Sequence, residues 1–195
     1  RALFKEGSLQ QYLQACADGW DKPDGELAAL AKERKIYPSV VLRWREHLRK
    51  LGDRHPVTAP WLALVKVPAE KFAAEREGVL VQVTATTALN PLISEPLKAT
   101  PPATMGDVCR LYAQVLAKYP DDQPMPDANA EAMRLVLKSA DGLEGVDAMG
   151  LARDFSVPER DEARRLRNEV EGYKATAENG PPRAMVMVDR GRPVE

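Results

Sequence analysis

The stretch TMGDVCRLYAQVLAKY, residues 104–119, is the most regular in the chain and decides its fold class. Thr104 is a good N-cap, and Asp107 follows three positions later as an acidic variant of the capping box. The apolar residues behind it recur at intervals of three and four, the spacing of one helix face. They are Val108, Leu111, Tyr112, Val115, Leu116 and Tyr119. We therefore expect a helix that begins after Thr104 and packs one face against a core.

Helices are predicted on both sides of this stretch. Pro38 suits the first position of a helix that ends at about Leu51, before Gly52. Another helix is predicted at 68–84. Because residues 79–87 are rich in β-branched side chains, a strand is the alternative for its C-terminal part. The other helical segments are residues 8–19, which Ser8 would cap, 26–35, 90–97, 129–139 and 156–177, with a short helical turn at 61–65. The sequence predicts seven or eight helices.

One short segment near the end is predicted to be a strand. Its apolar run is Met185, Val186, Met187 and Val188, and it follows a Pro-Pro pair that ends the preceding helix. A single strand leaves its backbone donors and acceptors unpaired, and no partner strand is visible upstream. The predicted fold is thus all-α, a multi-helix bundle or set of helical hairpins, with one strand at about 183–189. We expect that strand to pair outside the chain or with a domain that the chain does not contain.

The expected organisation has three parts. They are an N-terminal helical segment at 1–88, a C-terminal helical segment at 89–178 that ends in a long helix, and a strand-containing junction at 179–195. A soft break at residues 85–104 separates the two helical segments. The alternative is that both segments form one domain.

Composition excludes some function classes. Apolar residues make up 44% of the 195 residues and charged residues 29%, values typical of a globular protein. The 28 basic and 29 acidic residues give a net charge of -1, which argues against nucleic acid as a partner. The sequence contains no apolar run of about 18 residues, so we predict no membrane span.

The sequence offers no recognisable catalytic motif, and we predict no catalytic residue, cofactor ligand or metal ligand in this chain. His47 and His55 are interpreted as packed or capping residues, with a metal or acid-base role as the alternative. Cys16 and Cys109 are interpreted as buried free thiols, with a disulfide between them as the alternative. The carboxylates of the 120–126 loop and Asp127 are interpreted as turn residues, although oxygen ligands for a cation are the alternative. The basic residues of the 38–51 helix are interpreted as a solvated face, with an acidic partner as the alternative.

Two features instead suggest contact with another protein. In the last helix, Leu166, Val170 and Tyr173 continue a seam from Ala163 at intervals of three and four, which suits a hairpin or coiled-coil partner. The unpaired strand run, residues 185–188, is the second candidate interaction element.

The segment PPRAMVMVD, residues 181–189, resembles the Pro-Arg-Ala-Met-Val-x-Val-Asp segment of large planctomycete and verrucomicrobial proteins. Those proteins join planctomycete-type cytochrome-c-like domains to a planctomycete-specific C-terminal domain. Similar short motifs occur in the same order upstream: His55-Pro56, Ala59-Pro60-Trp61, Asn90-Pro91-Leu92 and residues 102–108. The resemblance covers residues 38–195, the helical region between the two named domains and the first strand of the C-terminal one.

The resemblance implies an exported, periplasmic or cell-surface protein, although this chain has no targeting signal. We expect a non-catalytic helical scaffold or interaction segment that contacts other domains of the parent protein or another protein chain. The alternative is a subunit or connector of an electron-transfer assembly whose haem lies on other domains or chains, because C-x-x-C-H is absent here. A weaker alternative is a module that binds glycans or other surface ligands.

Overall fold

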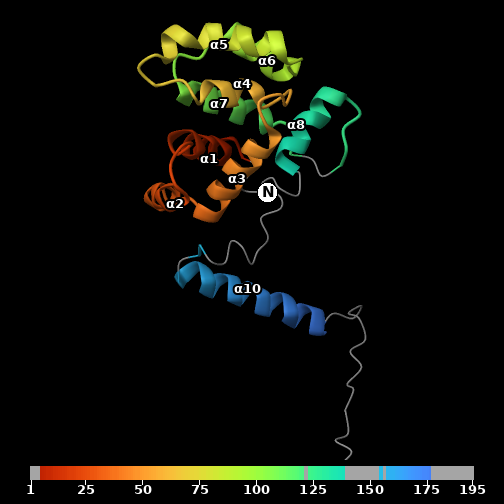
Figure 1. Ribbon diagram of the computed structural model, residues 1–195. Coiled ribbons are helices and arrows are strands. Elements are labelled where there is room, and N and C mark those ends of the chain that lie inside the picture. Colours follow the sequence, from red (N-terminus) through yellow and green to blue (C-terminus); the bar gives the residue numbers. More distant parts are fainter. Residues whose placement is uncertain (1–4, 121–122, 139–153, 156, 177–195) are drawn as a thin grey trace, which may run out of the picture. The chain divides into compact units, whose positions relative to one another are not determined.

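The computed structural model of the 195-residue chain describes residues 5–120, 123–138, 154–155 and 157–176. The fold is all-α, and the described residues contain nine helices and no strand (Figure 1). The strand predicted at 183–189 lies outside the described residues. The helices are α1 (Glu6–Asp18), α2 (Asp24–Glu33), α3 (Pro38–Leu51), α4 (Ala59–Leu64), α5 (Phe72–Thr86), α6 (Pro91–Ala99), α7 (Met105–Leu116), α8 (Ala128–Lys138) and α10 (Val157–Thr176).

The chain divides into two compact units, residues 1–154 and residues 155–195. In the first unit α1 packs against α7 and α3, and α2 packs against α3. On the other side of α7, α4 packs against α5, while α6 and α8 pack against α7 (Figure 1). Helices from both sides of the suggested break at 85–104 therefore share contacts. In the second unit, α10 is the described helix.

The first unit encloses one hydrophobic core in which large aromatic side chains are buried. Trp44 of α3, Trp61 of α4 and Tyr112 of α7 are each at most 1% exposed. Trp20, in the turn after α1, meets Trp61 edge to face with ring centroids 5.3 Å apart, a favoured arrangement for two aromatic rings. Each fully buried aromatic or aliphatic side chain of this kind stabilises the fold by about 1.5–3 kcal/mol.

The helix predicted from the opening stretch is confirmed, as α7. The Thr104 hydroxyl accepts a hydrogen bond from the Asp107 amide, and the Asp107 carboxylate accepts one from the Thr104 amide. These reciprocal bonds satisfy backbone donors that a helix start leaves unpaired. Helix α3 likewise begins at Pro38 and ends at Leu51, as predicted.

One local prediction was wrong, and one alternative that the sequence left open is decided. Helix α1 begins at Glu6, so Ser8 lies inside the helix and the N-cap prediction was wrong. Residues 79–86 are helical, which decides against the strand alternative. The hydroxyl of Thr84 there donates to the carbonyl of Leu80 one turn earlier, a bond that satisfies this polar side chain inside a helix.

Candidate functional site

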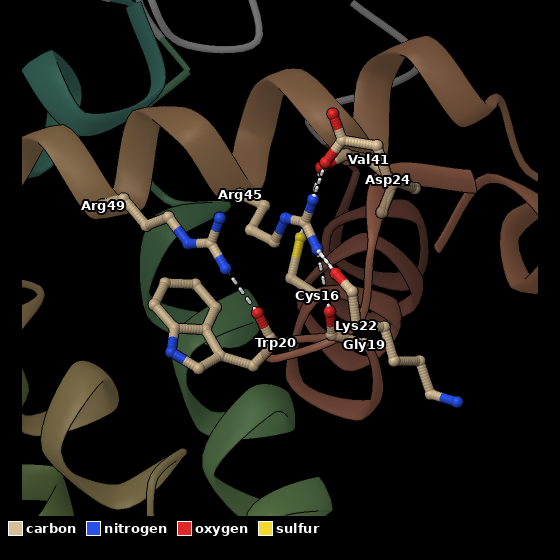
Figure 2. A network of polar contacts seen from close by, with 8 residues as sticks. All are labelled: Cys16, Gly19, Trp20, Lys22, Asp24, Val41, Arg45 and Arg49. Carbon is tan, nitrogen blue, oxygen red and sulfur yellow. Dashed lines mark hydrogen bonds and ion pairs between the residues drawn. The ribbon is translucent and has the colours of Figure 1, made fainter. Parts of the chain in front are cut away.

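A buried arginine organises the polar contacts at the junction of α1, α2 and α3. Arg45 lies on α3 and is only 3% exposed. Its Nη1 donates to the carbonyls of Gly19 at 3.0 Å and Lys22 at 2.7 Å, and its Nη2 pairs with the Asp24 carboxylate. Figure 2 shows the guanidinium pointing from α3 toward these three acceptors. The interpretation of all the α3 basic residues as a solvated face was therefore wrong for Arg45.

Arg49, one turn further along α3, extends this network. Its Nη2 donates to the Trp20 carbonyl at 2.6 Å, and its guanidinium carbon lies 5.1 Å from the centroid of the Trp20 ring (Figure 2). This is the range of a cation–π contact. Together the two arginines fix the turn between α1 and α2 to α3, and every acceptor belongs to this unit. We interpret this network, Arg45 and Arg49 with their acceptors, as structural.

Both histidines have structural partners. His47 of α3 is buried, and its Nε2 lies 3.0 Å from the carbonyl of Val136 in α8. The Nδ1 of His55 accepts a hydrogen bond from the Val57 amide at 3.3 Å. Burial lowers the pKa of His55 below its usual value, and the neighbouring His47 lowers it further. His47 therefore fastens α8 to α3, and His55 stabilises its own loop as a neutral ring.

Both cysteines are free and buried. The Cys16 thiol donates to the carbonyl of Val41 at 3.6 Å (Figure 2). Burial raises the pKa of Cys16 strongly, and it raises the pKa of Cys109 to about 12. Because the thiolate is the reactive form, neither side chain suits a nucleophile at neutral pH.

Asp127, the described carboxylate among the loop residues considered as cation ligands, serves the start of a helix. Asp127 accepts a hydrogen bond from the Ala130 amide at 2.8 Å, as expected of a turn residue at the start of α8. Residues 121 and 122 lie outside the described residues. Within the described ranges, no group of three or more His, Cys, Asp or Glu side chains is arranged to hold a metal ion.

None of the described helices is long and apolar enough to cross a bilayer.

Some motif residues of the family resemblance meet each other in the fold. Asn90 is 3% exposed and caps α6, where its side-chain oxygen accepts from the Leu92 amide at 3.0 Å. Its side-chain nitrogen donates to the carbonyl of Asn129 at 2.8 Å, and its backbone amide donates to the carbonyl of Pro56 at 3.0 Å. Asn90 thus joins the loop before α4, the start of α6 and the start of α8. The geometry gives this motif a structural role.

A groove runs between α5 and α6 on the first unit. Its volume is about 580 Å³, and its apolar lining includes Leu80, Val81 and Leu97. Val81 is 64% exposed. Basic Arg76 and Lys98 and acidic Glu77 also line it, so the charges do not select one sign of partner.

The seam residues predicted for the last helix lie on α10. Leu166 is 48% exposed, Val170 51% and Tyr173 75%. Ala163, at the start of the seam, is half-buried. The other predicted interaction residues, Met185 to Val188, lie outside the described residues. The seam side chains Leu166, Val170 and Tyr173 are therefore exposed on α10 itself, and this seam is the candidate interaction surface.

Ion pairs stabilise α10 along its polar sides. Arg165 pairs with Glu162 and Glu169 at 2.6 Å each, and Arg164 pairs with Asp161 at 2.8 Å. Such pairs between residues three or four apart add a few tenths of a kcal/mol each to a helix in general. They favour the helix by a small amount and involve none of the apolar seam residues.

Comparisons with known proteins assign no family. No protein-family model matches the chain, and neither a curated protein nor a solved structure matches it.

Proposed function

We propose that this chain is a non-catalytic helical scaffold segment of a larger exported multidomain protein, and that α10 contacts another protein chain or domain. The observation that carries the proposal is the exposure of Leu166 and Val170 at seam spacing on one helix. In the first unit, by contrast, the equivalent aliphatic side chains of α1, α3 and α7 are buried. An apolar stripe on an otherwise polar helix is stable when a partner covers it.

The polar groups of the first unit support the non-catalytic part of this proposal. The arginine network, both histidines and Cys16 bind groups of their own unit, and Cys109 is buried in it. The electron-transfer and glycan-binding alternatives stay predictions, as does the exported location. A haem absorbance band that co-purifies with the native parent protein would favour the electron-transfer alternative.

Hydrogen exchange followed by mass spectrometry tests whether α10 needs a partner. In dilute solution of the full chain we expect the amides of α10 to exchange fast, while those of α1, α3 and α7 exchange slowly, because an isolated helix opens readily. Slow exchange of α10 at every protein concentration would mean that its own chain holds it, and would overturn the proposal. Two variants of α10 belong to the same hydrogen-exchange experiment. Leu166→Gln removes an apolar seam residue but retains helix propensity, and Val157→Gln, which replaces an exposed residue elsewhere on α10, is its matched control.

A further inference from the structure

The α10 seam follows a heptad repeat, and its flanking charges fall in two separate rows. With Ala163 and Val170 at the first position of successive heptads, Leu166 and Tyr173 take the fourth position. The residues at the fifth position are all basic: Arg160, Arg167 and Lys174. Those at the seventh position are acidic in the first two heptads, Glu162 and Glu169. These two rows border the seam on opposite sides.

The separation of the rows fixes the favourable orientation of two copies. In a parallel pair of helices, the seventh position of one chain faces the fifth position of the next heptad on the other chain. Glu162 then faces Arg167 of the second copy, and Glu169 faces Lys174. In an antiparallel pair, each row faces its own kind, so basic residues meet basic residues and acidic meet acidic. Because like charges that face each other across a helix pair repel, the parallel arrangement is favoured.

The seam residues agree with the same arrangement. A β-branched residue at the first heptad position with Leu at the fourth favours a parallel coiled coil of two helices. Helix α10 has Val170 and Leu166 at these positions. Both side chains are about half exposed, so they are accessible. Within the described part of the chain Arg167 has no ion pair. Glu162 and Glu169 share Arg165, and Lys174 pairs with Glu171, but these exposed intrahelical pairs are of small energetic value.

We propose that α10 is a homodimerisation helix that pairs in parallel with α10 of a second copy through Leu166 and Val170, with Glu162 facing Arg167 and Glu169 facing Lys174 across the pair. This inference rests on the proposed function and names its partner as a second copy of this chain. The seam has four positions, so the association is weak and depends on protein concentration.

Sedimentation of the full chain over a concentration series tests the stoichiometry. The expected mass rises from the 21.5 kDa of one chain to twice that value. Arg167→Glu places Glu against Glu in the parallel pair, and we expect the dissociation constant to increase roughly tenfold. Arg164→Glu makes the same charge change away from both rows and is the matched control, with little expected effect. The double variant Glu162→Lys with Arg167→Glu should recover dimerisation.

Orientation has its own readout. Tyr173→Cys lies near one end of the seam, so under oxidation it should form a covalent dimer in a parallel pair, while the buried Cys16 and Cys109 do not react. Tighter association of Arg167→Glu, or failure of Tyr173→Cys to cross-link within a dimer, would overturn the parallel arrangement. A chain that stays monomeric with rapidly exchanging α10 overturns self-association alone and leaves a different protein as the partner. A monomer with slowly exchanging α10 overturns the proposed function as well.

Discussion

Replacement of Arg45 by methionine should destabilise the first unit by about 2–4 kcal/mol, an effect dominated by lost hydrogen bonds to main-chain carbonyls. The guanidinium donates to the carbonyls of Gly19 and Lys22, and hydrogen bonds from a charged donor contribute about 1.5–3 kcal/mol each. Methionine fills much of the same volume but donates to neither. Its lower desolvation penalty offsets part of the loss, which places the expected value below the simple sum.

The ion pair with Asp24 should contribute much less. The Asp24 side chain is 81% exposed, although its partner Arg45 is buried. Water therefore competes for this carboxylate, and Asp24→Asn should lower the free energy of unfolding by at most about 1 kcal/mol. That small effect should shrink further at high salt, whereas the effect of Arg45→Met should change little.

Urea unfolding followed by far-UV circular dichroism measures both effects. Lys50→Met changes an exposed basic residue on the same helix and should alter the free energy of unfolding by no more than about 0.5 kcal/mol. If Asp24→Asn destabilises the protein as much as Arg45→Met, the ion pair and not the carbonyls holds the turn. If Arg45→Met matches the Lys50→Met control, the network does not stabilise the fold and the reasoning fails.

Three further predictions concern single groups in the same unit. Lys35 has a φ of 57° at the end of α2, where the amides of Lys35 and Ile36 donate hydrogen bonds back to carbonyls of the helix. Because glycine adopts positive φ without strain, Lys35→Gly should raise the free energy of unfolding in urea by about 0.5–1 kcal/mol. A loss of stability would contradict this interpretation of the helix end. Tyr112→Phe leaves the carbonyl of Val57 without its 2.8 Å hydroxyl donor and should destabilise by about 1–3 kcal/mol in the same assay, a result that unchanged stability would refute. Because burial raises the pKa of Cys109 from 9.0 to about 12, its contribution to stability is complete below pH 9 and falls as the pH rises toward 12. Urea midpoints across that range should fall more steeply for the wild type than for Cys109→Ala, and parallel curves would contradict the assignment.

Features that depend on a few neighbouring residues could be predicted from the sequence. The capping box at Thr104 and Asp107 is satisfied within four residues, and Pro38 needs only its own restricted φ to begin α3. The start of α1 was predicted less well, because Ser8 is also compatible with a helix interior. Helix existence follows from spacing, while an exact first residue depends on contacts that spacing does not encode.

The burial of Arg45 could not be predicted with the same reasoning, because its acceptors come from a distant turn. The composition of the 38–51 helix suggested a solvated basic face. Only the fold brings the carbonyls of Gly19 and Lys22, in the turn after α1, close to α3. One signal was nevertheless present. Arg45 lies four residues after Val41 and three before Leu48, so it shares a face with two buried apolar residues. An arginine in that position is expected to need buried acceptors, and the chain supplies them.

For the α10 seam the sequence is more informative than the structure of the single helix. The groove between α5 and α6 and the α10 seam both expose apolar side chains, so exposure by itself does not distinguish a partner-binding surface. Charge does distinguish them. The groove has charges of both signs in its lining, whereas α10 separates basic fifth positions from acidic seventh positions on either side of its apolar residues. A surface with that order can discriminate between parallel and antiparallel copies of itself, because one orientation joins opposite charges and the other joins like charges. For this reason the charge reversal at Arg167, which leaves every apolar contact in place, is a sharper test of the partner than any truncation of the seam.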